Sequence, residues 1–388
     1  MIAMARRRSG ALLQRSVPRI EAAAPTALGP IVIAAGGTAG HVFPATALAA
    51  VLSARGFRPI VLTDPRAAGQ TFAGAEKYVI PGSGVAGHGP RRAFTALTAL
   101  AAGTLFARRL LALLRPQAVV GFGGYPSLAP VLAARLLRQR PAILLHEQNA
   151  VLGRANRALA CLADGIAISV SPTRHAPRAA VLTGNPVRAA IAARAATRFA
   201  TPAIAGPFSL LVLGGSLGAR AFSDLVPAAL ADLPMRGTLA VVQQCRPEDL
   251  ARVEAAYAAS GITADLAAFF ADMPSRMAAA HLVIARAGAS TVAELAVIGR
   301  PAVLIPLPSA IDDHQRANAA VLSAAGAAVV LDEQRLTAAG LAGAIASLLA
   351  DPMRLAAMAA AAARFGRADA GESLADFLGA VTVRRWRR

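Results

Sequence analysis

Short runs of hydrophobic residues alternate along this chain with longer segments in which apolar residues recur at helical spacing. Unbroken runs rich in valine, isoleucine and leucine are typical of strands that are buried on both faces of a parallel sheet. In the first half, the runs predict strands at 31–35, 59–63, 118–121, 141–146 and 165–169, with a weaker one at 179–182. The segments between them predict helices at 44–55, 93–114, 127–138 and 151–161.

The second half repeats this alternation. Its hydrophobic runs predict strands at 208–213, 239–243, 281–284, 302–305 and 328–331. The other segments predict helices at 217–230, 248–259, 290–298, 314–324, 336–349 and, as the last element, about 352–379. Alternation of strands and helices is typical of a doubly wound α/β fold. A chain of 388 residues is long enough for two such domains.

Proline and glycine indicate where the two domains meet. Pro202, Gly206 and Pro207 interrupt the pattern within 192–207, which we interpret as the linker. We therefore expect an N-terminal domain at 30–191 and a C-terminal domain at 208–365. A basic, disordered extension is expected at 1–29, and a helix with a basic tail at 366–388 that can cross back to the N-terminal domain.

A glycine-rich turn follows the first predicted strand of each half. The two turns read Gly36-Gly37-Thr38-Ala39-Gly40-His41 and Gly214-Gly215-Ser216-Leu217-Gly218-Ala219. Such turns aim backbone N–H groups and a helix N-terminus at an anion, commonly a phosphate. The first turn lacks the G-x-G-x-x-G spacing of nicotinamide-binding folds, although Asp64 ends the next strand where those folds have an acidic residue. A bound nucleotide is favoured, and a nicotinamide-dependent oxidoreductase is the alternative.

Polar side chains follow several predicted strands of the first half. His41 ends the first glycine turn, where it can take a proton or merely bond the turn backbone. Tyr125 lies in the glycine-rich segment 121–127, at the sheet edge where α/β folds bind ligands. The sequence His146-Glu147-Gln148-Asn149 can orient sugar hydroxyls or cap the following helix.

Other groups suit a nucleotide. Ser216 can donate to a phosphate oxygen, and Phe270 can form the wall of a site for a base. Arg188 can bind a phosphate with both arms of its guanidinium or form an ion pair at the domain interface. Glu294 can accept hydrogen bonds from both hydroxyls of a ribose, or complete a capping box at the start of its helix with Ser290.

Charge narrows the choice of partners. The net charge is +19, of which residues 1–188 carry +17 and residues 189–388 carry +2. A basic domain attracts a polyanion such as an anionic membrane or a nucleic acid. No nucleic-acid-binding motif accompanies the charge, so a nucleic-acid partner is not expected.

The cysteines, the paired acids and the apolar segments further restrict the compartment, the possible cofactors and the relation to a membrane. Cys161 and Cys245 form neither a disulfide framework nor a metal motif, which favours a reducing cytoplasm. Asp312-Asp313 has no third ligand nearby, so neither a metal nor another cofactor is expected. The apolar segment 93–107 is too short to span a membrane. With arginines at both ends, it suits docking on a membrane surface or burial in the domain core.

Seven segments in series resemble the MurG family of glycosyltransferases, in the family's order and over about residues 30–375. They are GGTAGHVFPA, FGGYPS, HEQN, TGNPVR, GGSLGAR, ARAGASTVAELAVIGRPAVLIPLP and DDHQRANA. The resemblance implies a GT-B fold, in which two Rossmann-like domains face a central cleft. It implies an inverting, metal-independent transfer of GlcNAc from UDP-GlcNAc to the C4 hydroxyl of the MurNAc residue of lipid I. That acceptor is undecaprenyl-pyrophosphoryl-MurNAc-pentapeptide, and the product is lipid II of peptidoglycan synthesis.

The resemblance also implies roles for individual residues and a cellular location for the protein. Contacts to UDP-GlcNAc are implied for Thr38, Ala39, Gly40, Asn149, Arg188, Ser216, Phe270, Glu294 and Gln315. We expect His41 to be the catalytic base or proton relay, with Glu147 as its rival. The acceptor and membrane side is expected to hold Tyr125, Arg91, Arg92, Arg108 and Arg109. The implied location is peripheral, on the anionic cytoplasmic face of the bacterial inner membrane.

Two features depart from the family pattern. Ala39 stands where the family usually has a third glycine, and the extension at 1–29 is atypical. Within the same fold, a UDP-GlcNAc 2-epimerase or a glycolipid synthase is the rival function.

Overall fold

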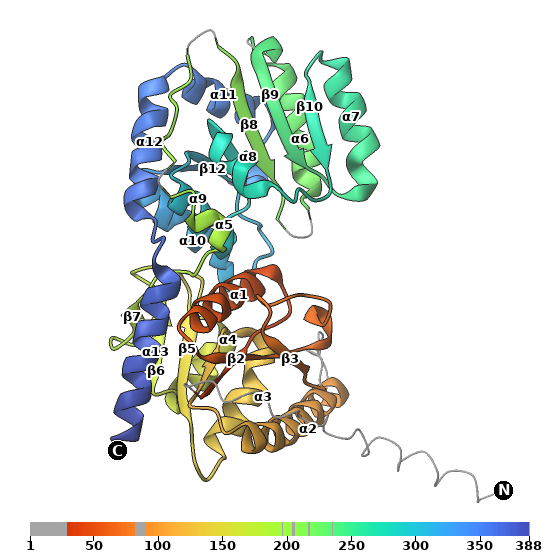
Figure 1. Ribbon diagram of the computed structural model, residues 1–388. Helices are drawn as coiled ribbons and strands as arrows, with labels where there is room; N and C mark the ends of the chain where they lie inside the picture. The colour runs from red at the N-terminus through yellow and green to blue at the C-terminus, as the bar shows by residue number, and fades with distance from the viewer. Residues whose placement is uncertain are drawn as a thin grey trace, which may run out of the picture.

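The computed structural model describes residues 29–81, 90–195, 197–203, 206–215, 218–234 and 236–387, without the side chains of residues 39 and 90–93. The extension expected to be disordered, apart from residue 29, and the glycine-rich segment 82–89 lie outside the described residues. The described chain forms two α/β domains, one above the other (Figure 1). Its C-terminal end lies beside the N-terminal domain.

The N-terminal domain has a parallel sheet that includes seven described strands in the order β3-β2-β1-β4-β5-β6-β7. Its central strands are the hydrophobic runs predicted from the sequence, because each is buried against helices on both faces. The order of the first six strands is that of a Rossmann fold. The strands are β1 (Pro30–Ala34), β2 (Arg58–Thr63), β3 (Glu76–Val79), β4 (Ala118–Gly121), β5 (Ala142–Glu147), β6 (Gly165–Ile168) and β7 (Val181–Leu182).

The C-terminal domain repeats this topology. Six described strands, all parallel, follow the order β10-β9-β8-β11-β12-β13. They are β8 (Phe208–Leu213), β9 (Leu239–Gln244), β10 (Ala264–Ala267), β11 (Leu282–Ala285), β12 (Ala302–Leu304) and β13 (Ala328–Val330). In both sheets the strand order reverses next to the first strand, and each glycine turn follows that strand. The crevice at such a reversal is where open α/β sheets bind ligands.

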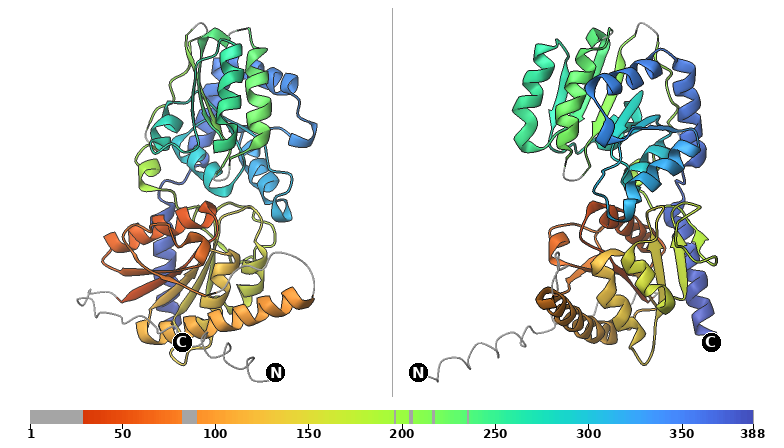
Figure 2. Two further views of the ribbon diagram at one scale, coloured as in Figure 1. Left: turned by 90° about the vertical axis from the view of Figure 1, so that its right-hand side faces the viewer. Right: turned by 180° about the vertical axis from the view of Figure 1, so that it is seen from behind.

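Helices cover both faces of each sheet (Figures 1 and 2). In the N-terminal half they are α1 (Ala39–Ala54), α2 (Pro90–Leu114), α3 (Gly124–Arg135), α4 (Arg154–Leu159) and α5 (Ala189–Ala192). In the C-terminal half they are α6 (Arg220–Ala231), α7 (Leu250–Ala259), α8 (Met273–Ala279), α9 (Ala289–Ile298), α10 (His314–Ala324), α11 (Ala338–Leu349), α12 (Pro352–Phe365) and α13 (Ala370–Trp386).

The structure differs from the predicted elements in five places. The strands β3 and β10 and the short helices α5 and α8 were not among the predicted elements. The single helix predicted at about 352–379 is wrong, because the chain leaves helical geometry between α12 and α13. At this break a Cβ added to Gly366 would lie 2.4 Å from the carbonyl oxygen of Ala296. Only a glycine lets the two backbones come this close.

The last helix belongs to the core of the N-terminal domain, although it follows the C-terminal domain in sequence. Its residues Leu374, Leu378 and Val381 are buried in one cluster with α1 and the N-terminal sheet. At the surface, Arg55 after α1 donates to Asp376 of α13 at 2.6 Å. The chain therefore passes between the domains twice, once before β8 and once between α12 and α13 (Figure 1).

We expect Leu378→Ala to destabilise the N-terminal domain by about 2–5 kcal/mol, because it removes a buried side chain and leaves a cavity. Val383 lies on the same helix but is 49% exposed, so Val383→Ala should change the stability by less than about 0.5 kcal/mol. Urea denaturation followed by circular dichroism measures both. Equal midpoints for the two variants would contradict the packing of α13 described above.

Candidate active site

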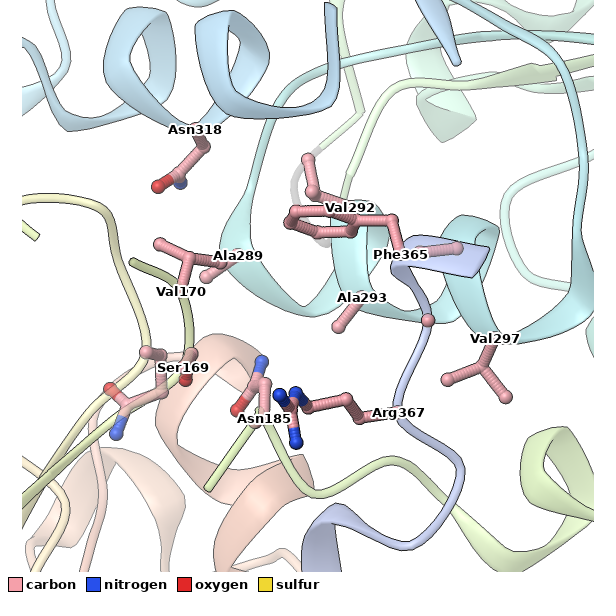
Figure 3. A pocket seen from close by; sticks show the side chains of 14 residues that line it. Ser169, Val170, Asn185, Ala289, Val292, Ala293, Val297, Asn318, Phe365 and Arg367 are labelled. Carbon is pink, nitrogen blue, oxygen red and sulfur yellow. The ribbon is translucent and has the colours of Figure 1, made fainter. Parts of the chain in front are cut away.

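A cleft lies where the two domains meet, and it contains about 450 Å³ of empty space. Side chains of both domains point into it (Figure 3). The N-terminal domain contributes Gln148, Ser169 and Asn185, and the C-terminal domain contributes α9 and Asn318 of α10. The crossing segment adds Phe365 and Arg367. One wall, made by α9, is apolar, and the opposite wall is polar.

The first glycine turn is hydrogen-bonded to Asp64, the residue that follows β2. Gly37 has a φ of +77°, and its N–H donates to Oδ1 of Asp64 at 2.9 Å. Oδ2 of Asp64 accepts from Arg66 at 2.6 Å. Both oxygens of this buried carboxylate are therefore engaged, so Asp64 shapes the turn and is not presented to a ribose. Thr38 is exposed at the N-cap of α1, and Gly40 lies in the first turn of that helix.

His41 lies in the first turn of α1 and is partly buried. Its Nδ1 is 2.8 Å from Oε1 of Gln148, beyond the end of β5. Its Nε2 is directed at Gly124, where an added Cβ would lie 3.3 Å from that nitrogen. Among the described residues, no hydrogen bond to Nε2 is formed. The imidazole is thus held by one nitrogen and has the other available.

Glu147, the rival base, is buried and fully engaged. Oε1 accepts from the backbone N–H of Asn149 at 3.0 Å and from its side chain at 3.1 Å. Oε2 accepts from the N–H of Gly153 and from the side chain of Asn156, both at 2.8 Å. These four donors occupy both carboxylate oxygens. This geometry favours holding the loop after β5 in place over proton transfer.

Two asparagines join the domains across the cleft. The Nδ2 group of Asn318 donates to Oδ1 of Asn149 at 3.1 Å and to the carbonyl of Ala287 at 3.0 Å. Its Oδ1 accepts from the N–H of Ala150 at 2.8 Å. Sequence reasoning did not assign a role to Asn318. A buried polar residue one helical turn after Gln315 was the signal that could have found it.

Two residues predicted to contact the donor meet in an ion pair. Arg188 donates with both arms to the carboxylate of Glu294, at 2.8 and 2.9 Å. The guanidinium also lies 4.8 Å from the ring centre of Phe43 in α1. Burial raises the pKa of Glu294, and the ion pair with Arg188 opposes that rise. Arg188 thus contacts both α1 of the N-terminal domain and α9 of the C-terminal domain.

The capping alternative for Glu294 is wrong. The N-cap of α9 is Gly288, and no side chain caps the helix. The hydroxyl of Ser290 is buried with no hydrogen-bond partner among the described residues. Glu294 instead faces the domain junction.

The remaining predicted donor contacts are spread around the C-terminal domain. Phe270 is buried, with the guanidinium of Arg276 stacked 4.2 Å from its ring centre, whereas Phe269 is 75% exposed. Gln315 lies in the first turn of α10, and its Oε1 accepts from the N–H of Leu307 at 3.0 Å. Ser216 lies outside the described residues, and so does the side chain of Ala39.

A strained loop before α10 forms a second contact between the domains, which sequence reasoning missed. Asp312 and Asp313 both have positive φ, of 53° and 54°, which costs non-glycine residues of order 1–3 kcal/mol each. The carboxylate of Asp312 accepts from Arg154 at 2.7 Å and from Arg157 at 3.2 Å. Arg154 holds the pKa of Asp312 below its usual range. The pair of acids is thus engaged by arginines.

The residues expected on the acceptor side lie in α2 and α3. Tyr125 borders a small cavity between α2 and α3, where its hydroxyl is buried without a partner among the described residues. Burial raises the pKa of this phenol. Arg108 and Arg109 are exposed on α2, and Arg91 and Arg92 are in its first turn, with side chains outside the described part. In the described part of the chain, no three His, Cys, Asp or Glu side chains are grouped as metal ligands.

Two Rossmann-like domains with a cleft between them are the architecture of GT-B glycosyltransferases. Residues 31–168 match the model of the glycosyltransferase family 28 N-terminal domain, and residues 209–374 match that of its C-terminal domain. Within this class, the chain belongs to the MurG family.

Three relatives illustrate the match. The UDP-N-acetylglucosamine–N-acetylmuramyl-(pentapeptide) pyrophosphoryl-undecaprenol N-acetylglucosamine transferase of Granulibacter bethesdensis is 57% identical, over 76% of this chain and 78% of that protein. The protein of the same name from Paramagnetospirillum magneticum is 50% identical, over 90% and 95%. The crystal structure of Acinetobacter baumannii MurG superposes with a TM-score of 0.73 at 32% identity, covering 90% of this chain and 99% of that one.

Proposed function

We propose that this chain transfers GlcNAc from UDP-GlcNAc to the C4 hydroxyl of the MurNAc residue of lipid I and so forms lipid II. The observation that carries this proposal is its membership of the MurG family over nearly its whole length. The geometry supports it, because the motif after β5 lies across one cleft from α9 and α10. The chain is therefore a UDP-GlcNAc-dependent hexosyltransferase.

In the proposed mechanism, His41 takes the proton of the acceptor hydroxyl. The oxygen then bonds to the anomeric carbon of GlcNAc while the bond from that carbon to UDP breaks. Arg188, Ser216 and the helix N-termini after the two glycine turns stabilise the departing diphosphate. The charge that leaves with UDP is thereby met by fixed N–H groups and a guanidinium.

The other proposed contacts fix the donor in position. The ion pair between Arg188 and Glu294 has to open when the donor binds, so that the freed Glu294 carboxylate accepts from the ribose hydroxyls. Phe270 lies beside the uracil. Asn149 and Gln315 bind hydroxyls of the GlcNAc, and Thr38, Ala39 and Gly40 form the loop that approaches the donor. Glu147 acts by holding Asn149, since its own oxygens are engaged.

Inversion predicts the linkage in the product. Because the donor is an α-glycoside, direct displacement gives a β-1,4 bond between GlcNAc and MurNAc. NMR of the disaccharide released from the product reads this configuration from the coupling of the anomeric proton. An α linkage would rule out the single displacement described here.

We also propose that α2 docks the protein on an anionic membrane at the cytoplasmic face. The side chains of Phe94, Leu97, Leu105 and Leu113 are between 59% and 69% exposed along this helix. Residues Phe94–Leu114 are long and apolar enough to cross a membrane, but a third of the stretch is buried, and Leu110 and Leu111 lie in the domain core. A helix anchored in this way suits the membrane surface. Figure 2 shows α2 at the end of the N-terminal domain remote from the C-terminal domain.

Reversing the charge at Arg91, Arg92, Arg108 and Arg109 to glutamate should weaken binding to anionic vesicles by about 10²-fold or more. Each cation near such a surface contributes about 1 kcal/mol. Vesicle sedimentation measures the effect. A matched variant carries the same reversal at four exposed arginines of the C-terminal domain and should bind normally: Arg236, Arg335, Arg354 and Arg364. Unchanged binding by the α2 variant would exclude this docking surface.

A further inference from the structure

A line of three hydrogen bonds connects the backbone of Gly184 to the side chain of His41. Nε2 of His146 is 3.0 Å from the carbonyl oxygen of Gly184, and Nδ1 of His146 is 2.9 Å from Nε2 of Gln148. Oε1 of Gln148 is then 2.8 Å from Nδ1 of His41. His146 and Gln148 are buried, so water does not compete for these bonds. The proton positions along the line can therefore be deduced from its ends.

The orientation of the Gln148 amide is fixed by a backbone carbonyl. The carbonyl oxygen of His146 lies 3.0 Å from one end of that amide. A carbonyl oxygen only accepts hydrogen bonds, so the group facing it must be the NH₂ of Gln148. The amide oxygen therefore points the other way, at His41. Since this oxygen also only accepts, Nδ1 of His41 must carry a proton.

The hydrogen bonds of His146, at the other end of the line, lead independently to the same orientation of the Gln148 amide. The carbonyl of Gly184 accepts, so Nε2 of His146 carries a proton and its Nδ1 has the lone pair that accepts from Gln148. Burial lowers the pKa of His146 to about 4, so this ring stays neutral near pH 7. Both carbonyls thus define one direction of donation along the line, from His41 to Gln148 to His146 to Gly184.

We propose that Gln148, supported by His146, is a positioning residue that fixes neutral His41 in the tautomer with its proton on Nδ1 and its lone pair on Nε2. This inference rests on the proposed function of His41 as base and names the atom that acts. Nε2 lies beside Gly124, 3.3 Å from where a Cβ of that residue would be, with Cδ of Pro126 next to the same position. When Nε2 takes the proton of the acceptor hydroxyl, the bond from Nδ1–H to Gln148 becomes charge-assisted and steadies the imidazolium.

The tautomer of the wild-type protein tests this directly. In ¹⁵N-labelled protein, long-range ¹H–¹⁵N correlation spectra distinguish a protonated ring nitrogen from one with a lone pair. The His41 signals are identified by their loss in His41→Asn. At a pH where the ring is neutral, we expect the proton on Nδ1. A proton on Nε2, or an even mixture of tautomers, would overturn the proposal, and this measurement needs no variant of Gln148 to fold.

A kinetic test separates positioning from binding. Gln148→Leu removes the acceptor for Nδ1, so kcat should fall about tenfold or more, since a wrong histidine tautomer can cost up to ~10⁴ in kcat. The KM for UDP-GlcNAc should stay within about threefold, and His41 should become a mixture of tautomers. As a control, Gln117→Leu replaces a glutamine just before β4, at the amino-terminal ends of the strands of the same sheet. This variant should leave kcat, the KM for UDP-GlcNAc and the His41 tautomer unchanged. An unchanged kcat with an unchanged tautomer in Gln148→Leu would overturn the proposal.

The two hypotheses can fail separately. If wild-type His41 has its proton on Nδ1 but His41→Ala keeps its kcat, then the hydrogen-bonded line stands and His41 is not the base. If His41→Ala loses kcat but wild-type His41 has its proton on Nε2, then the base stands and the role of Gln148 is lost.

Discussion

Replacing His41 by alanine or asparagine is expected to lower kcat by at least about 10²-fold, which is the usual effect of losing a general base. The imidazole ring of His41 directly follows the first glycine turn. Its Nδ1 is hydrogen-bonded to Gln148, and its Nε2 is available. The rival base, Glu147, is less available, because its two oxygens accept from four donors. Initial rates at saturating UDP-GlcNAc and acceptor measure the effect.

His175 provides the matched control. It is exposed on the loop before β7 and has a φ of +63°, which asparagine tolerates. His175→Asn should therefore keep the wild-type kcat. A loss of less than tenfold in the His41 variants, with the control unchanged, would remove His41 from the role of base.

Replacing Glu294 by alanine is expected to lower kcat/KM for UDP-GlcNAc by about 10²-fold or more. A carboxylate that accepts from two ribose hydroxyls forms two charge-assisted hydrogen bonds, each contributing about 1.5–3 kcal/mol. In the structure the same carboxylate is bound by Arg188, so the change also leaves that guanidinium without its acidic partner. We expect the loss mainly in KM.

An exposed glutamate of the same domain serves as control. Glu254 lies on the solvent side of α7, and Glu254→Ala should not alter kcat/KM. Calorimetric titration with UDP measures binding without the acceptor and should show the same weakening for Glu294→Ala. Wild-type affinity for UDP in that variant would contradict contact between Glu294 and the ribose.

The sequence predicts the central strands well and the edge strands poorly, for a physical reason. Interior strands such as β1, β4 and β8 are buried on both faces and so appear as hydrophobic runs. The two missed strands, β3 and β10, lie at the edges of their sheets. Their sequences Glu-Lys-Tyr-Val and Ala-Asp-Leu-Ala contain charged residues because edge strands are less covered.

An ion pair of Arg188 at the domain interface was one of the predictions, but its partner could not be identified from local patterns. Arg188 and Glu294 are 106 positions apart, and each suits an isolated role in its own motif. Their pairing depends on how two separately folded domains meet. The same holds for Asn318, whose amide bonds both domains at once. By contrast, the glycine turns and the HEQN segment were recognisable, because each follows a strand directly.

The most direct test of the central claim is the release of UDP from UDP-GlcNAc, with and without a soluble lipid I analogue, in the presence of EDTA. We expect the release of UDP to require the analogue and to be unaffected by EDTA. Release without the analogue would contradict it and indicate a hydrolysing epimerase. Loss of release in EDTA would contradict the metal-independent mechanism, and no release by folded protein in either case would contradict the assignment of UDP-GlcNAc as the donor.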